Sequence, residues 1–148
     1  MNSTNTSIPT FGTAPTDVHI THRRAVYAII MVNDKIATVR TPRGYYLPGG
    51  GIDRNESDEQ ALARELREEL GWTISINRYV GCAKQYFYSE AEQKHYLTTG
   101  QFYEAMYIGT SSLPTEPDHV LEWMTKEEAE LQLKFEDKRW AVRQSLFC

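Results

Sequence analysis

The first third of the chain contains a block of apolar residues, followed by short polar and apolar blocks that predict strands joined by turns. Residues 25–32 form a continuous apolar run, which is typical of a central strand covered on both faces. The polar residues 33–35 predict a hairpin turn into a second strand at residues 36–40. A further turn at residues 41–44 leads into a short strand over residues 45–47.

The next segment has the pattern of a short amphipathic helix. Leucines recur every fourth position over residues 62–70 and form one apolar stripe. Ser57 followed by Gln60 matches a capping box, which predicts the start of the helix. Gly71 is the residue expected to end the helix in a left-handed conformation.

The remaining sequence predicts a long hairpin and two terminal helices. Strands are predicted at residues 72–76, about 79–88, 95 to about 108 and 120–124, and helices at residues 126–133 and 137–147. Gly100 within the return strand predicts either a bulge or a close approach of other groups. In the last helix we expect an apolar set to face the core: Trp140, Val142, Leu146 and Phe147.

The chain is expected to be a single domain preceded by a flexible tail. Residues 1–17 are rich in Ser, Thr, Asn and Pro and show no periodicity, which predicts a flexible N-terminal tail with local packing of Phe11. Residues 18–148 contain no repeat and no linker. At 148 residues, 41% hydrophobic and 11% aromatic, the sequence is sufficient for one globular domain with a substantial core.

Charge and cysteine content narrow the expected environment and partners. A net charge of −4 argues against nonspecific nucleic-acid binding, although a bound cation would still permit a nucleotide ligand. Cys82 and Cys148 are the only cysteines and have no metal-binding spacing, so we expect a reducing cytoplasm. No apolar run approaches the ~20 residues of a membrane span, and there is no apolar signal core.

Three carboxylates are clustered on the predicted helix. Glu65, Glu68 and Glu69 fall at i, i+3 and i+4 and therefore share one face. Like charges at this spacing destabilise a helix, and a hard divalent cation would relieve their repulsion. The glycines at residues 49–51 allow a ligand to approach the backbone closely. The segment therefore predicts a metal–phosphate site, the alternative being a solvated charged face.

The whole segment resembles the Nudix box. The pattern is Gly, five residues, Glu, seven residues, Arg-Glu, an aliphatic residue, one residue, Glu-Glu, one residue, Gly and a hydrophobic residue. The matching positions here are Gly50, Glu56, Arg64, Glu65, Leu66, Glu68, Glu69, Gly71 and Trp72. Trp72 is a mild departure, since a smaller aliphatic residue is more usual there. The resemblance implies an α/β fold of the Nudix type, with a mixed β-sheet sandwiched between α-helices.

The resemblance also implies an activity and a cofactor. Nudix enzymes hydrolyse the pyrophosphate linkage of a nucleoside diphosphate linked to another moiety, using Mg²⁺ or Mn²⁺. Glu65 and Glu69 are expected to hold the metal together with the Gly49 backbone carbonyl. Glu68 would be a further ligand or would orient the attacking water.

Other box residues have implied supporting roles. Arg64 is expected to position the catalytic carboxylates Glu65 and Glu68 by pairing with a neighbour such as Glu56. Glu56 and Gly50 are expected to lie behind the metal ligands, with Glu56 holding its loop against the helix.

The general base and the substrate-recognition residues are left open by the sequence. Family members place the base on the box or on a later loop, where the candidates here are Glu116, Asp118 and His119; the alternative is that they are ordinary polar loop residues. For stacking on a nucleobase the candidates are Tyr86, Phe87 and Tyr88. Side chains alternate along a strand, so the 86/88 pair or Phe87 would face the substrate, but not both sets.

Tyr88 resembles a tyrosine of family members that act on diadenosine polyphosphates. Phe87 stands near the position where ADP-ribose-cleaving members carry a proline, which argues against ADP-ribose. The basic cluster at residues 22–24 is interpreted as a solvated strand entrance or a phosphate contact.

We expect a small-molecule nucleotide-type substrate, no nucleic-acid partner, no membrane and a monomer or homodimer. The alternative function is a nucleotide-sensing Nudix domain without catalytic activity.

Overall fold

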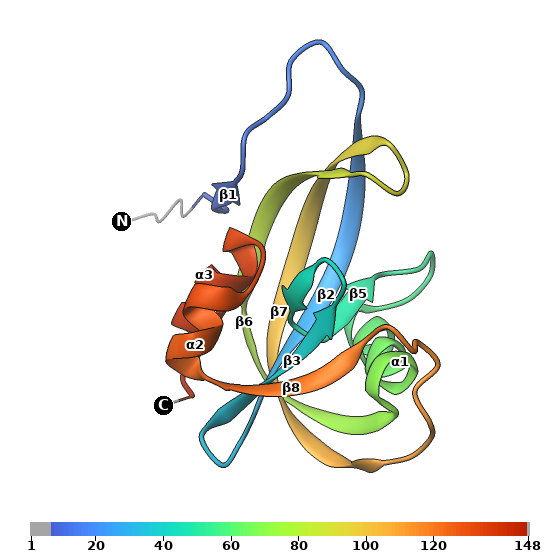
Figure 1. Ribbon diagram of the computed structural model, residues 1–148, viewed down its shortest axis with the longest axis vertical. Coiled ribbons are helices and arrows are strands. Elements are labelled where there is room, and N and C mark those ends of the chain that lie inside the picture. The colour runs from blue at the N-terminus through green and yellow to red at the C-terminus, as the bar shows by residue number, and fades with distance from the viewer. Residues whose placement is uncertain (1–6, 148) are drawn as a thin grey trace.

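An eight-stranded mixed sheet forms the centre of the computed structural model, which describes residues 7–147 (Figure 1). The strands are β1 (Thr10–Phe11), β2 (Ile20–Val32), β3 (Lys35–Thr41), β4 (Gly44–Tyr46), β5 (Gly49–Gly51), β6 (Trp72–Ser89), β7 (Lys94–Thr110) and β8 (Val120–Thr125). The main order is β1-β6-β7-β2-β3-β4, with β5 paired to β2 and β8 to β3. The pairs β2/β7 and β1/β6 are parallel, whereas the other pairs are antiparallel.

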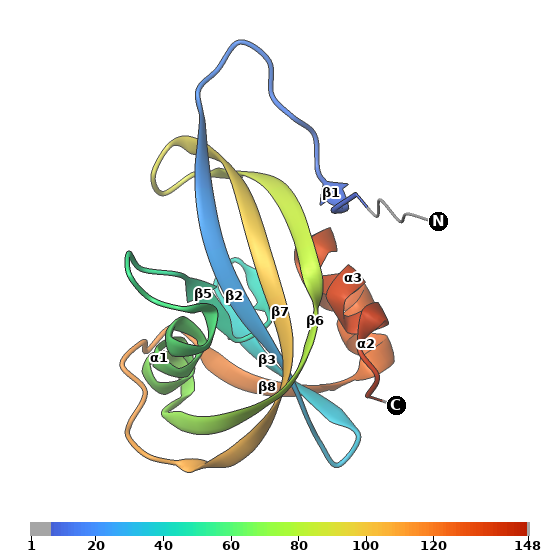
Figure 2. The ribbon, with the colours of Figure 1, turned by 180° about the vertical axis from the view of Figure 1, so that it is seen from behind.

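Helices cover both sides of the long strands. Helix α1 (Asp58–Leu70) lies on one side, and α2 (Lys126–Gln132) and α3 (Glu136–Gln144) lie on the other, as both ribbon views show (Figures 1 and 2). The predicted mixed sheet between helices is therefore confirmed. None of the helices in residues 7–147 combines the length and the apolar character needed to cross a membrane.

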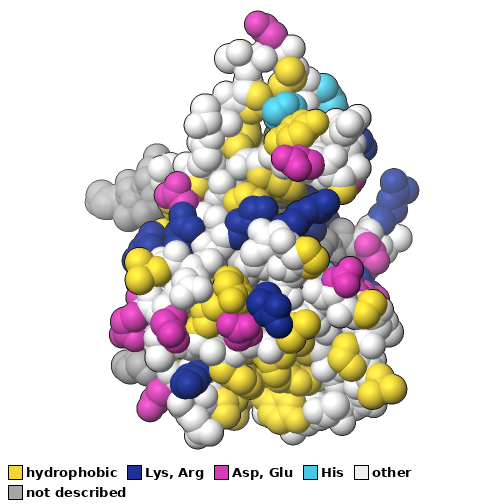
Figure 3. All heavy atoms as spheres, viewed as in Figure 1, with side chains coloured by type: hydrophobic (Ala, Val, Ile, Leu, Met, Phe, Trp, Pro, Cys, Tyr) yellow, Lys and Arg dark blue, Asp and Glu magenta, His cyan; other side chains and the backbone are white. Residues whose placement is uncertain are grey.

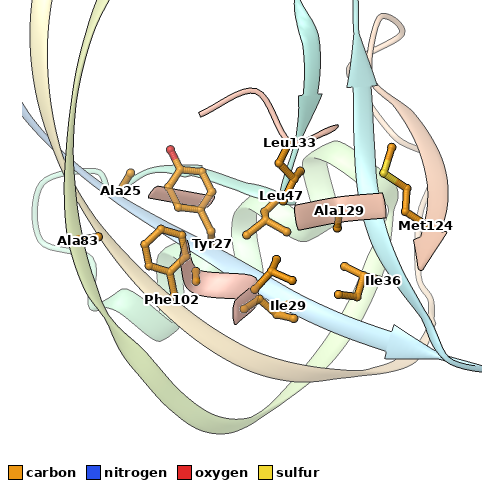
Figure 4. Close-up of a cluster of buried hydrophobic side chains, with 12 residues drawn as sticks. Ala25, Tyr27, Ile29, Ile36, Leu47, Ala83, Phe102, Met124, Ala129 and Leu133 are labelled. Carbon is orange, nitrogen blue, oxygen red and sulfur yellow. The ribbon is translucent and has the colours of Figure 1, made fainter. Parts of the chain in front are cut away.

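Strand β2 separates two hydrophobic clusters, as its continuous apolar sequence predicted. On one face Ala25, Tyr27 and Ile29 pack with residues of α2 and α3. Figure 4 shows this cluster, in which side chains from β2, β3 and β7 meet those of α2. On the other face Val26, Ala28 and Ile30 pack with Ala61, Leu62, Leu66 and Leu70 of α1. The alternation follows from the two-residue period of a strand.

The ends of α1 are set by local sequence. The Ser57 side chain accepts a hydrogen bond from the Gln60 backbone N–H, and the Gln60 side chain accepts one from Ser57 N–H. Gly71 adopts φ 72°, a left-handed conformation, and its N–H donates to Arg67 and Leu66 carbonyls. The capping box and the C-terminal glycine are both confirmed.

The hairpin between β2 and β3 is also confirmed. Asn33 and Asp34 have φ values of 51° and 65°, which suit a tight two-residue turn whose twist matches the strands.

The predicted break between residues 76 and 79 is wrong, because β6 is one continuous strand. Its pairing with β7 contains register shifts at Thr73/Ile74, Ile76/Arg78 and Tyr79/Gly81. These irregularities interrupt the local alternation while the hydrogen-bonded partner strand continues. Gly100 lies in regular pairing with Ala83, so the bulge interpretation is wrong. A Cβ at Gly100 would approach the Phe102 ring at 3.2 Å, which favours the close-approach interpretation.

The last helix ends earlier than predicted. Residues after Gln144 leave the helix, and the Ser145 hydroxyl and Leu146 N–H both donate to the buried Glu104 carboxylate, at 3.1 and 2.6 Å. The prediction that Leu146 faces the core is wrong, since it is 69% exposed. Trp140, Val142 and Phe147 do lie in or against the core.

Part of the predicted N-terminal tail is paired with the sheet. Strand β1 lies parallel to β6, and Phe11 packs against the hydrophobic cluster beside α3. Residues 1–6 and Cys148 lie outside the described residues. The flexibility of residues 1–17 stays a prediction.

Removing the buried Leu66 side chain should destabilise the fold. Leu66 is fully buried between α1 and β2, so Leu66→Ala should lower the free energy of unfolding by about 2–5 kcal/mol, measured by urea denaturation. Leu131→Ala is the matched control, because Leu131 is 81% exposed on a helix, and should change stability by less than about 0.5 kcal/mol. Equal effects of the two substitutions would contradict this packing of α1.

Candidate active site

Helix α1 presents three carboxylates whose exposures differ. The exposed fractions of the side chains are 8% for Glu69, 15% for Glu65 and 42% for Glu68. Glu69 lines a pocket together with Gly49 and Gly50 of β5. The three acids therefore form an acidic edge whose exposure to solvent increases from Glu69, beside β5, to Glu68.

Glu69 is held between a backbone donor and an imidazole. Gly49 N–H donates to Glu69 Oε1 at 3.0 Å, and His119 Nδ1 lies 2.8 Å from Glu69 Oε2. Burial raises the pKa of Glu69 to about 7, although both of these contacts act to lower it. Burial disfavours the charged form of this carboxylate, and a cation bound beside it would favour the charged form.

Glu65 lies directly against the glycine backbone. A Cβ on Gly50 would collide with the Glu65 carboxylate, and a Cβ on Gly49 would collide with the Val26 carbonyl. Close packing of β5 against β2 therefore requires glycine at position 49, and at position 50 the absence of a side chain leaves the space that Glu65 occupies. Burial raises the pKa of Glu65 to about 7, while the guanidinium of Arg64 opposes this shift.

Arg64 binds the loop that precedes α1. Its Nε and Nη2 donate to the two oxygens of Glu56, at 2.7 and 2.9 Å, and Nη2 also donates to the Gly51 carbonyl at 2.9 Å. This bidentate pair lowers the pKa of Glu56 to about 2. Arg64 Nη1 additionally lies 3.3 Å from Glu68 and 3.6 Å from Glu65. One guanidinium thus connects the loop to two of the three carboxylates.

The loop between β7 and β8 docks on the C-terminal end of α1. Thr115 N–H donates to the Glu68 carbonyl at 2.8 Å, which satisfies a carbonyl in the last turn of the helix. The same loop brings Glu116 within 3.0 Å of His119. Oxygen or nitrogen atoms of Glu69, Glu116 and His119 lie within 4.8 Å of one another. Of the three predicted loop candidates, Asp118 is exposed and does not belong to this group.

This donor set fits a divalent cation. Carboxylate oxygens suit Mg²⁺ and Mn²⁺. Burial raises the pKa of Glu65 and of Glu69 more than Arg64 and His119 lower it. The Gly49 N–H points to Glu69; the predicted role of the Gly49 carbonyl as a metal ligand stays a prediction.

A pocket of about 380 Å³ opens beside the carboxylates. Its polar and glycine lining consists of Arg23, Thr41, Arg43, Gly49, Gly50, Glu69, Gln85, Ser89, Glu90, Thr98, Lys134 and Lys138, and its other lining residues are Tyr27, Tyr46, Leu47, Phe87, Tyr88 and Phe135. Lys and Arg side chains lie across the middle of the face that Figure 3 shows.

The three aromatic candidates of β6 have different positions. Phe87 lines the pocket and stacks on Tyr96, with ring centroids 5.2 Å apart. Tyr88 also borders the pocket, is 49% exposed and contacts the ring of His95. Tyr86 lies outside the pocket lining. The lining therefore combines Phe87 with Tyr88 and matches neither predicted set, the 86/88 pair or Phe87 without that pair.

Several pocket residues carried no sufficient signal in the sequence. Arg23, within the basic cluster at residues 22–24, lines the pocket, and the basic motif was the available signal for it. Phe135, Lys134 and Lys138 come from the segment around the start of α3, where no motif marks them.

A family model described as NUDIX domain matches residues 21–145. The chain is similar to an 8-oxo-dGTP diphosphatase of Buchnera aphidicola subsp. Schizaphis graminum, with 34% identity over 80 residues, covering 50% of this chain and 61% of that protein. It is also similar to a CTP pyrophosphohydrolase of Escherichia coli, with 29% identity over 110 residues, covering 70% of this chain and 76% of that protein. The chain thus spans less than two thirds of the length of the first relative.

The fold has a counterpart among solved structures. A NUDIX hydrolase from Nitrosomonas europaea matches with a TM-score of 0.67 and 19% identity, over 84% of this chain and 88% of that chain. This likeness concerns the fold alone. The family model, in contrast, covers most of the chain and includes the complete box from Gly50 to Trp72. The chain belongs to the Nudix family.

Proposed function

We propose that the chain is a divalent-metal-dependent pyrophosphohydrolase, which cleaves the pyrophosphate linkage of a nucleoside diphosphate joined to another moiety. The observation that carries this proposal is the buried Glu69 carboxylate, which lines the pocket and contacts the His119 imidazole. The names of the two relatives, an 8-oxo-dGTP diphosphatase and a CTP pyrophosphohydrolase, support a nucleotide-type substrate.

The metal would be held by the carboxylates of α1. Glu65 and Glu69 offer the most buried oxygens, and Glu68 lies at the exposed end of the same edge. Bound there, Mg²⁺ or Mn²⁺ supplies charge neutralisation at phosphate oxygens and lowers the pKa of a water molecule. Arg64 keeps Glu65 and Glu68 oriented through its bidentate pair with Glu56.

The remaining steps are assigned to side chains around the pocket. Arg23 supplies positive charge for the phosphate groups, since it lines the pocket beside β5. Glu116 and His119 are positioned to accept a proton from the attacking water, because they contact each other and His119 contacts Glu69. Phe87, together with Phe135, provides an aromatic surface for a nucleobase.

Neutralising single carboxylates of α1 should abolish most of the activity. Glu68→Gln and Glu69→Gln should each lower kcat/KM by roughly 10²–10⁴-fold, because each removes a charge that acts at the phosphates or on the water. The assay is release of phosphate or nucleotide with Mg²⁺ from nucleoside triphosphates, nucleotide sugars, dinucleoside polyphosphates and ADP-ribose. Glu59→Gln is the matched control, since Glu59 lies exposed on the same helix.

Parental rates in both site variants, on a substrate that the parent hydrolyses, would show that the site is wrongly assigned. Binding without turnover across the same substrates would favour the alternative, a nucleotide-sensing domain.

The later loop should contribute through two of its three candidate residues. Glu116→Gln and His119→Gln should each lower kcat by about tenfold to a hundredfold and alter its pH profile, because they contact the Glu69 centre. Asp118→Asn should leave the rate and the profile unchanged, since Asp118 is exposed. If all three variants keep the parental profile, this loop does not supply the base.

The metal-free protein should become less stable as the pH rises. The pKa of Glu65 and of Glu69 is raised from 4.5 to about 7 on folding, so the folded chain binds protons more tightly than the unfolded chain. Their contribution to the free energy of unfolding is therefore present below about pH 4.5 and is lost as the pH rises to about 7. The melting temperature without metal should fall between pH 5 and pH 8, measured by circular dichroism.

A bound cation should reverse this loss. At a hundredfold excess over Kd, Mn²⁺ contributes about 2.7 kcal/mol, which corresponds to a rise in melting temperature of roughly 5–10 °C at pH 8. The rise should shrink at lower pH because protons compete for the same oxygens. A Glu65→Gln/Glu69→Gln variant should lose both responses. If that variant shows the same pH and Mn²⁺ responses as the parent, the carboxylates of α1 do not bind the metal.

A further inference from the structure

A buried lysine lies in the pocket wall on the side of α3. The Lys138 side chain is 6% exposed and lines the pocket, and its Nζ lies 3.1 Å from Asp137 Oδ2. The ammonium also lies 4.3 Å from the centre of the Tyr27 ring. Asp137 is fully buried and does not belong to the pocket lining. The lysine, and not its carboxylate partner, therefore faces the pocket.

Lys138 remains a cation in this position. Burial by itself lowers the pKa of Lys138, but Tyr27 and Asp137 outweigh that effect, and the net shift is upward. An ammonium has three N–H donors and no acceptor. Asp137 and Tyr27 engage at most two of them, so at least one donor remains for a ligand.

The neighbouring polar groups do not offset this donor character. Gln85 Nε2 donates to the Tyr86 carbonyl at 3.0 Å, and Gln85 Oε1 accepts from Asp137 N–H at 3.1 Å, so both ends of this amide are engaged. The Thr98 hydroxyl has no hydrogen-bond partner among the described residues, and it can rotate to donate or accept. Lys138 is thus the buried charged donor in this part of the pocket.

Aromatic rings flank the same part of the pocket. Phe87 and Phe135 have ring centroids 5.5 Å apart, and Lys138 Nζ lies 5.4 Å from the centre of the Phe135 ring. The Tyr46 ring, from β4, also packs beside Phe135, with the two ring centroids 6.1 Å apart. Lys134 Nζ also lies 5.4 Å from the centre of the Phe135 ring, but its side chain is exposed, whereas Lys138 is buried. Flat rings beside a buried ammonium suit a planar heterocycle that carries an acceptor on its edge.

We propose that Lys138 determines base specificity by donating a hydrogen bond to the carbonyl oxygen of a keto-bearing nucleobase, of the uracil or guanine type. A base with an exocyclic amino group at that edge would place N–H donors against the ammonium and leave its remaining N–H donor without an acceptor. A site built to hydrogen-bond one group discriminates strongly against an analogue that lacks it. This inference rests on the proposed function, because it assigns the base of that same substrate.

The test compares substrates of similar size. UTP and CTP differ at the C4 keto or amino position, and GTP and ATP differ at C6 in the same way and also in the 2-amino group of GTP. The parent protein should show kcat/KM at least about tenfold higher for UTP than for CTP and for GTP than for ATP. Lys138→Gln should reduce both ratios to near one, because an amide can present either a donor or an acceptor.

Lys134→Gln is the matched control for loss of charge. Lys134 is exposed at the pocket, with its Nζ 6.0 Å from the Tyr46 ring centre, and its removal should leave both ratios unchanged. Lys138→Gln leaves Asp137 buried without its partner, so its melting temperature is measured in parallel. If the Lys138→Gln variant unfolds, the Asp137→Asn/Lys138→Gln variant, which removes both charges together, takes its place in the comparison.

Binding separates failure of this inference from failure of the proposed function. The affinities of the same four nucleotides are measured by calorimetry with Ca²⁺ for the parent and the variants, without need for turnover. Absence of hydrolysis with a keto preference in binding would contradict the proposed function and support the specificity assignment. Hydrolysis with equal rates or an amino preference in the parent would overturn the assignment alone. Failure to bind any of the four would also overturn it.

Discussion

The contact on which the site depends is the hydrogen bond from Gly49 N–H to the buried Glu69 carboxylate. It joins the end of α1 to strand β5, and β5 in turn pairs with the central strand β2. His119, in the loop between β7 and β8, contacts the second oxygen of the same carboxylate from fifty positions later in the chain. Because the carboxylate is buried, each of these contacts is strong, and their loss would leave an unpaired buried acid. The core, the box and the later loop therefore meet at one side chain.

Close packing of the glycine strand makes this contact possible. A Cβ at Gly49 would collide with the Val26 carbonyl, and a Cβ at Gly50 would collide with the Glu65 carboxylate, so Glu65 lies directly against the backbone. Arg64 supports the arrangement from outside, since its pair with Glu56 fixes the loop before α1. The raised pKa values of Glu65 and Glu69 are the electrostatic consequence of placing acids in this confined space.

The pocket adds a second, cationic region to this acidic one. Arg23, Arg43, Lys134 and Lys138 line it from β2, the β3–β4 turn and the segment around the start of α3. The acidic edge suits a cation, the two arginines suit phosphate groups and Lys138 suits the proposed base acceptor, so the two regions agree with the proposed metal–nucleotide substrate. This complementarity agrees with a net charge of −4 for the chain as a whole, because the cations are local to the pocket.

The sequence by itself determined the local elements and the acidic edge. Capping by Ser57, the glycine at position 71 and the i, i+3, i+4 spacing of the three glutamates all act within a few residues, so helix α1 and the clustering of its acids could be predicted. The continuity of β6 and the exposure of Leu146 could not, because they depend on pairing with β7 and on hydrogen bonds to Glu104. Tertiary structure alone decided that Glu116 and His119, but not Asp118, reach Glu69, and that Lys138 faces the pocket while Asp137 lies behind it. The Glu69–His119 and Gln85–Asp137 contacts join residues about fifty positions apart. No periodicity in the chain encodes which side chains of a loop or of a helix start will make contacts of this kind.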